Sequence, residues 1–195
     1  MDRGIVGPIT MAILKIAKMG HPILKEVAKA VDDPTSREIR ELLDNMRETM
    51  TDAGGVGLAA PQIYVSLRVM IFQIPAEREG DQMAFEEQVL INPELQFLGD
   101  EKEDGWEGCL SVPDLRGSVP RFTHINYQGW DQNGKQIKRE ASGFHARVVQ
   151  HEYDHLEGIL FVDLLKPLKK RFVKKKLDKI KKGQIQSDYK MVFHR

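Results

Sequence analysis

The sequence has a single cysteine, Cys109, which excludes an internal disulfide and favours a reducing compartment. It also lacks any run of about 18 apolar residues, which is the length that a membrane-spanning helix needs. The first twenty residues show no positively charged end leading into an apolar stretch and a small-residue cleavage site, so no secretory signal is predicted. We therefore expect a protein of the cytoplasm or of an organellar matrix, with neither membrane nor DNA as a partner.

A net excess of charge is also missing, because 29 Lys and Arg residues balance 29 Asp and Glu residues. This balance hides an uneven distribution along the chain. Between Lys166 and Lys182, ten basic residues stand against Asp178 alone, which leaves 19 bases and 28 acids elsewhere. An acidic body joined to a basic tail indicates that the tail has a partner of its own.

The 195 residues contain no internal repeat and no low-complexity linker, so one domain with a tail is the simplest organisation. We expect an irregular extension over residues 1–10, a main domain over 11–167, and a basic amphipathic helix with its tail over 168–195. Leu168, Phe172, Val173, Leu177 and Ile180 fall on one stripe of that helix, which would pack on the body or on a partner.

Local patterns predict an α+β fold. Apolar residues at helical spacing follow Ser36 and end at Gly54 and Gly55, which predicts an N-terminal helix. Residues 67–75 and 88–97 have the composition of strands, the second broken at Asn92 and Pro93. Residues 123–140 are typical of a hairpin that turns at Asp131-Gln132-Asn133-Gly134, where Asn-Gly supplies the residues with a positive φ. A second helix is predicted over 144–156. Strands flanked by helices favour antiparallel or mixed sheets packed around this central helix.

The central helix carries the strongest chemical signal, His151-Glu152-Tyr153-Asp154-His155. Residues four apart on a helix lie on one face, so His151 and His155 can bind one ion at ~2.0–2.1 Å. Glu152 then lies near a water molecule on that ion, as a catalytic base would. Apolar neighbours place the helix in the core, where two histidines beside two acids need a purpose. The segment therefore predicts a metal site.

The third ligand must lie upstream of this segment. Phe161 occupies the position at which one class of metal-dependent hydrolases has a third His. Another class takes a Glu from a later helix, but no Glu follows Glu157. Glu157 itself is rotated about 120° from the His face. Cys109 is favoured because thiolates bind zinc and iron well. His124 and His145 remain alternatives at this point, although His124 is expected to face solvent and His145 to lie on another face of the helix.

Three segments together resemble the peptide deformylase family: Gly55-Val-Gly-Leu-Ala-Ala-Pro-Gln62, Glu107-Gly-Cys-Leu-Ser-Val-Pro113 and Gln150-His-Glu-Tyr-Asp-His-Leu-Glu-Gly158. The likeness runs from about Ile13 to about Lys170. It implies that Cys109 is the third ligand, and that the main domain removes the formyl group from the N-terminal formyl-methionine of newly made polypeptides. One divalent ion is implied, Fe²⁺ in the cell, which Zn²⁺, Ni²⁺ or Co²⁺ can replace in a purified sample.

The resemblance also implies roles for individual residues. Glu152 would move the protons, and the Gln62 side chain and the Leu110 N–H would donate to the developing oxyanion. The glycine-rich backbone around Gly57 would line the peptide cleft, with Arg147 near it. Tyr64 departs from the family, many members of which have Gly there. The residues that match the methionine pocket are Val56, Trp106, Phe144 and Val148.

Two further expectations concern alternatives. A catalytically inactive, metal-stabilised binding module on the same scaffold would be expected to lack Glu152 or Gln62, and this sequence keeps both. A substrate that emerges from the ribosome gives the basic helix a candidate partner, ribosomal RNA. The competing interpretation is a solvated charged helix that only aids solubility.

Overall fold

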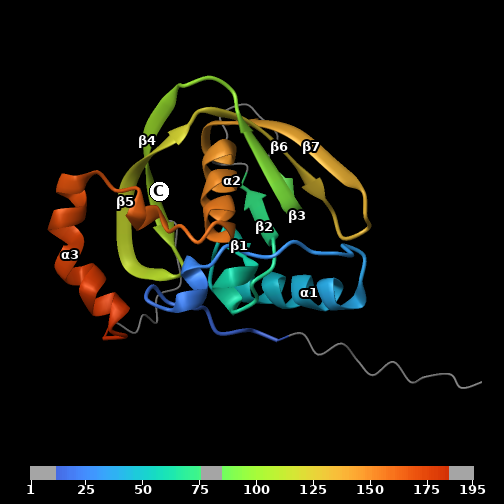
Figure 1. Cartoon of the computed structure of the whole chain (residues 1–195), viewed down its shortest axis with the longest axis horizontal. Helices are drawn as coiled ribbons and strands as arrows, with labels where there is room; N and C mark the ends of the chain where they lie inside the picture. Colours follow the sequence, from blue (N-terminus) through green and yellow to red (C-terminus); the bar gives the residue numbers. More distant parts are fainter. Residues whose placement is uncertain (1–11, 76–84, 185–195) are drawn as a thin grey trace, which may run out of the picture.

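The computed structural model describes residues 12–75 and 85–184, in which two antiparallel sheets enclose the helix α2 (Gly143–Leu156), as Figure 1 shows. The expected extension over residues 1–10 and the end of the tail, residues 185–195, lie outside this part of the chain. The predicted α+β class is confirmed, and the central position of the helix with the two histidines is confirmed with it.

The larger sheet has five strands in the order β1-β2-β3-β6-β7, each antiparallel to its neighbour. Its second strand is buried on both faces, which explains the unbroken apolar run in the sequence. Its strands are β1 (Gly57–Ala59), β2 (Val69–Ile74), β3 (Phe85–Phe97), β6 (His124–Trp130) and β7 (Gln136–Ser142).

The strand β3 continues through Asn92 and Pro93, where a break was predicted. The register with β6 shifts between Ile91 and Glu94, and Asn92 has a φ of 50°. The Asn92 side chain holds this irregularity, because it accepts from Val31 N at 2.8 Å and donates to Val31 O at 2.9 Å. The two residues therefore bend the strand without ending it.

The turn between β6 and β7 lies where the Asn-Gly pair predicted it. Gly134 has a φ of 74°, whereas Asn133, which we expected to share the left-handed conformation, does not. The Asp131 side chain explains the difference, since its Oδ1 accepts from the backbone N–H of both Asn133 and Lys135 at 2.8 and 2.9 Å. This Asx-type turn removes the need for a second positive φ.

The smaller sheet is a hairpin of β4 (Lys102–Cys109) and β5 (Val112–Phe122), which the sequence patterns did not predict. The first strand is mostly exposed and acidic, and the second contains Pro113 and Pro120, both of which argue against a strand. A two-stranded sheet tolerates them because each strand has an unpaired edge. The hairpin places Cys109 beside its tight end, paired with Val112.

The helices other than α2 lie around the sheets. Ser36 caps α1 (Arg37–Asp52) by accepting from Ile39 N at 3.3 Å, in the position that the sequence predicted. Within the described ranges, no helix is both long enough and apolar enough to cross a membrane. The described residues also form the short 3-10 helices η1 (Pro22–Lys25), η2 (Ala60–Ile63) and η4 (Phe161–Asp163).

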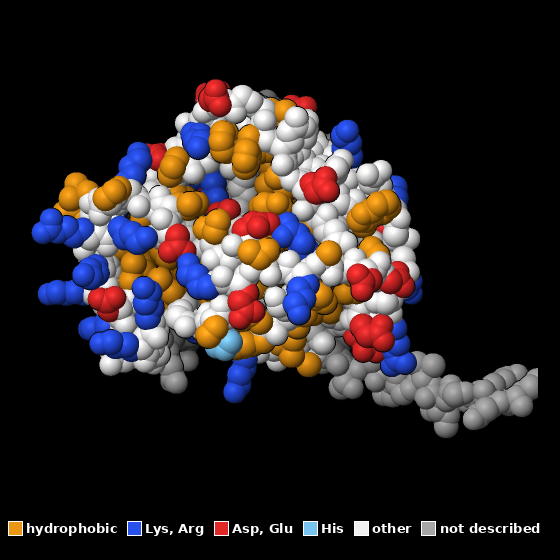
Figure 2. Space-filling view, viewed as in Figure 1, with side chains coloured by type: hydrophobic (Ala, Val, Ile, Leu, Met, Phe, Trp, Pro, Cys, Tyr) orange, Lys and Arg blue, Asp and Glu red, His pale blue; other side chains and the backbone are white. Residues whose placement is uncertain are grey.

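The helix α3 (Pro167–Lys181) lies beyond β5, at the end of the molecule opposite to α1 (Figure 1). Part of its predicted apolar stripe packs on the body: Leu177 and Ile180 are buried in the cluster that includes Met19, and the partly buried Val173 packs against that cluster. Leu168 and Phe172 are 65% and 80% exposed, so these two residues of the stripe do not pack on the body, and their expected packing on a partner stays a prediction. Lys and Arg side chains gather over this end of the molecule in Figure 2.

Candidate metal centre

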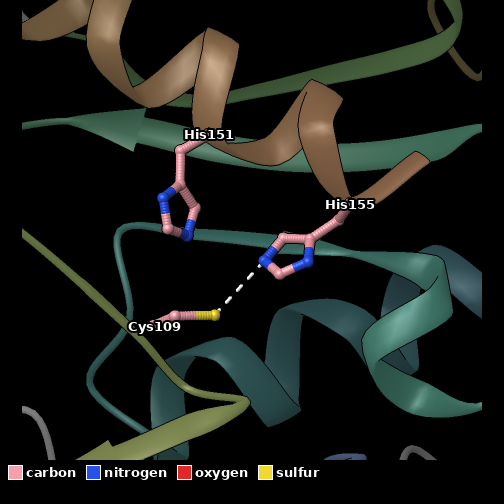
Figure 3. A group of neighbouring side chains, drawn as sticks. All are labelled: Cys109, His151 and His155. Atoms are coloured by element: carbon pink, nitrogen blue, oxygen red, sulfur yellow. Dashed lines mark hydrogen bonds between the residues drawn. The ribbon is translucent and has the colours of Figure 1, made fainter. Parts of the chain in front are cut away.

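Three side chains converge at the heart of the molecule, Cys109, His151 and His155. Their candidate ligand atoms all lie within 4.8 Å of one another, and Sγ of Cys109 lies 3.3 Å from Nε2 of His155 (Figure 3). The two imidazoles project from successive turns of α2 toward the end of β4. The helix supplies the spacing, and the β4–β5 hairpin brings the sulfur to it.

The other two histidines considered for the site lie elsewhere. His124 is exposed and contacts the hydroxyl of its neighbour Thr123. His145 is buried, with its Nε2 3.1 Å from the Tyr127 hydroxyl, on a different face of α2 from His151. Glu157, also set aside, pairs with Arg68 at 2.8 Å.

The donor set fits a transition-metal ion. A thiolate with two imidazoles is the chemistry that zinc and ferrous iron accept. Hydrogen bonds with Cys109 and Glu107, and their negative charges, raise the pKa of His151 well above its usual value although burial opposes this. The same anionic surroundings would stabilise a metal cation on this ring in place of the proton. Burial and the charges of His151 and Arg121 lower the pKa of His155, which keeps that imidazole neutral, as a ligand must be.

Glu107 fixes the orientation of His151. Its Oε2 lies 2.8 Å from Nδ1 of His151, which leaves Nε2 of that ring to face the centre. The carboxylate also accepts from Arg121 Nε and Nη2 at 2.8 and 3.0 Å, and from Arg147 Nη1 at 3.0 Å. Burial alone would raise the pKa of Glu107, but the hydrogen bonds from His151 and Arg121 hold it far below its usual value.

Arg121 completes this network by contacting Asp154 at 2.5 Å. It therefore links the hairpin to the acid that lies within the His151–His155 segment. The sequence patterns indicated no role for Arg121 or Glu107. A charged residue at an inward position of β5 would have indicated a buried ion pair at Arg121, but only if that strand had been predicted.

Glu152 is 4% exposed and lies against Gly57, where an added Cβ would overlap its carboxylate. This close approach explains why a glycine occupies that position of β1. Burial raises the pKa of Glu152 to about 7, with the charge of His151 opposing the rise and that of Glu107 adding to it. Its Oε2 is buried without a protein hydrogen-bond partner in the described part of the chain. Such an orphaned oxygen indicates that a ligand or water binds there.

The Gln62 side chain is held with its amide N–H₂ toward the centre. Its Oε1 accepts from Ala59 N at 2.9 Å, so its Nε2 faces Ser111 Oγ at 3.2 Å and Cys109 Sγ at 3.6 Å. Leu110 follows the cysteine and lines the adjoining pocket. The structure thus brings both expected oxyanion donors beside the ligands.

A pocket opens onto these residues and includes every expected site residue apart from the more deeply buried His155. Val56, Phe144 and Val148 form an apolar wall, while Trp106 is 71% exposed and stands at the rim. Glu107 and Arg116, two charged residues that the sequence patterns did not indicate as part of the site, also line it. The full lining is Val56, Gly57, Gln62, Trp106, Glu107, Gly108, Cys109, Leu110, Arg116, Phe144, Arg147, Val148, His151 and Glu152.

Arg147 lines the pocket and also joins α2 to the hairpin. Its guanidinium donates to the backbone oxygens of Glu103, Gly105 and Val119 at 2.7, 3.4 and 3.0 Å. Gly105 makes room for it, because a Cβ there would meet the guanidinium at 2.5 Å. The position of Arg147, which the sequence left open, is therefore a structural bridge at the pocket wall.

Comparisons with known proteins give a consistent result. The family model described as polypeptide deformylase matches residues 13–171. A peptide deformylase of Bordetella pertussis is 54% identical over 156 residues, which cover 80% of this chain and 89% of that protein. One of Ralstonia nicotianae is 54% identical over 150 residues, covering 76% and 85% of the two chains.

Solved structures agree with this result. The crystal structure of peptide deformylase from Ehrlichia chaffeensis superposes with a TM-score of 0.80 at 33% identity, covering 89% of this chain and 99% of that one. A Met-Ala-Ser-bound peptide deformylase from Acinetobacter baumannii superposes with a TM-score of 0.74 at 41% identity, covering 80% and 100%.

Proposed function

The chain belongs to the peptide deformylase family and has the hydrolase activity of that family, and we propose how its own residues perform it. The substrate is the N-terminal formyl-methionine of newly synthesised polypeptides, in the bacterial cytoplasm or an organellar matrix. The reaction forms a bond between a water oxygen and the formyl carbon, breaks the C–N bond, and releases formate and a free amine.

One observation carries this proposal: the three ligands converge beside a buried carboxylate, in a pocket that has one apolar wall. A binding module without catalysis would have no use for a buried Glu152 with an unpaired oxygen. Nor would it need the Gln62 amide held toward the ligands. Catalysis therefore explains these two residues better than metal-stabilised binding does.

Cys109, His151 and His155 would hold one divalent ion, which supplies Lewis acidity and lowers the pKa of a bound water toward ~7. We propose Fe²⁺ as the ion in the cell, with Zn²⁺, Ni²⁺ or Co²⁺ as substitutes in a purified sample. The usual affinity order favours zinc over ferrous iron, so availability during synthesis of the protein decides which ion is bound.

The pocket would take the methionine side chain of the substrate. Val56, Phe144 and Val148 offer an apolar wall, and the Trp106 ring can cover the mouth. The strand β1 is an edge of the larger sheet, so the backbone groups of Gly57 on its outer side can pair with an extended peptide. The Met-Ala-Ser peptide bound to the Acinetobacter baumannii relative supports a substrate of this kind.

Within this arrangement each polar group has a task. The Gln62 amide and the Leu110 N–H would donate to the oxygen of the formyl carbonyl as it gains negative charge, each worth ~10²–10³ in rate. Glu152 would accept a proton from the attacking water and deliver it to the leaving nitrogen. A pKa of about 7 suits a group that must both accept and donate a proton near neutral pH.

The direct test is anaerobic purification, metal analysis and a formate-release assay on a short formyl-methionyl peptide. We expect one ion per chain and formate release that is lost on chelation and restored by Fe²⁺. Cys109→Ser should lose iron-dependent activity and most of the bound metal, because a weakly acidic hydroxyl replaces a soft thiolate. An iron-loaded wild-type chain that releases no formate would overturn the proposal.

We also propose that α3 binds ribosomal RNA, which would bring the enzyme to emerging chains. Arg171, Lys174 and Lys175 are exposed, and Asp178 is the only acid within this helix. Because so few acids pair with the cations of α3, the like charges repel along the helix and lower its stability unless a polyanion binds there. The division of the chain into a catalytic domain over 11–167 and a tail over 168–195 stays a prediction. The buried Leu177 and Ile180 join the tail helix to the body.

A further inference from the structure

The backbone of the segment Ala17–Met19 is hydrogen-bonded to the two chain segments that carry the oxyanion donors. Ala17 N donates to Gln62 O at 2.7 Å, and Met19 N donates to Ser111 O at 2.8 Å. Both side chains of this segment that flank Lys18 are buried, so the backbone around Lys18 is fixed. The lysine therefore stands at a defined position beside the turn that follows Cys109.

Lys18 uses its ammonium to hold that turn. Its Nζ donates to the carbonyl oxygen of Leu110 at 2.9 Å. The same peptide unit carries the N–H of Ser111 at its other end, and this N–H donates to Cys109 Sγ at 3.4 Å. One peptide group thus lies between an ammonium and the sulfur ligand, with its positive end toward the sulfur.

This chain of contacts has an electronic consequence. A cation on a peptide oxygen polarises the group and makes its N–H a stronger donor, because neighbouring hydrogen bonds reinforce one another. A stronger N–H donor on a thiolate withdraws electron density from the sulfur. Hydrogen bonds to sulfur ligands tune the metal that the sulfur holds.

We propose that Lys18 is a positioning residue for the metal centre, which acts through the Leu110–Ser111 peptide to weaken electron donation by Cys109 and to fix the Leu110 N–H. The proposal rests on the metal site argued above. A sulfur that donates less leaves the bound ion a stronger Lewis acid, which favours turnover without changing how the peptide binds.

The placement of Lys18 is hard to explain as an ordinary surface cation. Its side chain is half-buried, and its hydrogen bond goes to a backbone oxygen. Burial lowers the pKa of Lys18, and the charges of Cys109 and Asp114 only oppose this shift. A half-buried ammonium costs free energy unless its charge serves a nearby anion, and the Asp114 carboxylate and a metal-bound Cys109 thiolate would be such anions.

The test uses the full-length chain loaded with Co²⁺, whose sulfur-to-cobalt charge-transfer band reports how readily the thiolate gives up electron density. Lys18→Met removes the charge at nearly constant shape, Lys18→Arg keeps a charged donor, and Lys15→Met is the matched control on an exposed lysine three residues away. Each variant is also assayed for kcat and KM with a formyl-methionyl peptide, and its thermal unfolding is recorded.

We expect Lys18→Met to move the band to longer wavelength and to lower kcat roughly 10-fold with little change in KM. Lys18→Arg should keep the band wavelength and kcat close to those of the wild type, and Lys15→Met should change neither quantity. If Lys18→Met unfolds, Lys18→Gln replaces it in the same comparison. A band that stays in place in the neutral variant, or that moves equally in Lys15→Met, overturns the role of Lys18.

Failure of the underlying metal site would look different. In that case the wild-type chain itself would show no charge-transfer band, or Cys109→Ser would keep it. An intact wild-type band, lost in Cys109→Ser and unmoved in Lys18→Met, contradicts the inference about Lys18 alone.

Discussion

Helices α2 and α3 have nearly the same length, 14 and 15 residues, and both carry several charged or ionisable side chains. In α2 eight residues are buried, and its ionisable groups contact specific partners such as Glu107 and Arg121. In α3 only Leu177 and Ile180 are buried, and most cations face solvent. Specific buried contacts therefore characterise α2, whereas exposed positive charge characterises α3.

The difference follows from the cost of burying charge. Removing one partner of a buried ion pair leaves the other uncompensated, which typically costs ~3–5 kcal/mol. Exposed charges cost little, and exposed pairs contribute only ~0–1 kcal/mol. Single substitutions in or around α2 should therefore have large and specific effects, whereas α3 should respond to the sum of its charges.

The largest effect is expected at Glu152. Glu152→Gln should keep the metal but lower kcat by ~10²–10⁴-fold, because an amide cannot accept the proton of the attacking water. Metal content and formate release measure the two properties separately. Glu157→Gln, on the same segment but paired with Arg68 away from the site, is the control. Near-normal turnover by a fully metallated Glu152→Gln chain would sink the assignment.

A smaller effect is expected at Glu107, on the hairpin side of the network. Glu107→Gln keeps a hydrogen-bond acceptor for His151 but removes the negative charge, so metal affinity should fall ~10–100-fold. Competition with a chelator measures it. Glu103→Gln, exposed on the same strand, should leave the affinity unchanged. Equal affinities in the two variants would mean that α2 holds its histidines without help from the hairpin.

Reversing positive charges on α3 tests whether this helix binds ribosomes. Truncation after Pro167 would also remove the buried Leu177 and Ile180, so substitution is the cleaner change. Arg171→Glu, Lys174→Glu and Lys175→Glu together should weaken co-sedimentation with ribosomes roughly 10-fold at low salt, with a shallower salt dependence, because fewer phosphate contacts release counterions. Formate release from a short peptide should be unaffected. If the wild type and the triple variant bind ribosomes equally at low salt, α3 is only a solvated charged helix.

The smallest effect concerns His145, at the start of α2. Burial, with the charge of Arg139 adding to it, lowers the pKa of His145 to about 4 from a usual 6.5. The unfolded chain therefore binds this proton more readily, so the contribution of His145 to stability is complete above pH 6.5 and is lost as the pH falls toward 4.

Urea unfolding at pH 7 and pH 4.5 measures this contribution. Between these values the wild type should lose about 1–2 kcal/mol more stability than His145→Gln, after allowance for solvent screening. His124→Gln, at an exposed histidine, should follow the wild type. If His145→Gln and the wild type lose equal stability, the buried imidazole is not the group that titrates.

The sequence by itself determined the elements whose signal is local. The spacing of His151 and His155 placed both on one face of α2, and Ser36 marked the start of α1, because helix periodicity and capping act within a few residues. The apolar run of β2 needed no partner to be recognised. Cys109 was favoured from the residues on its chemistry, and the resemblance to the family named it as the ligand.

Only the tertiary structure decided which distant residues complete the centre. Glu107 meets Arg121 across 14 residues and His151 across 44, and Lys18 reaches Leu110 across 92. Periodicity carries no information over such separations, since these contacts depend on how the sheets close around α2. The hairpin β4–β5, which the acidic first strand and the prolines of the second concealed, is the element that brings these groups together.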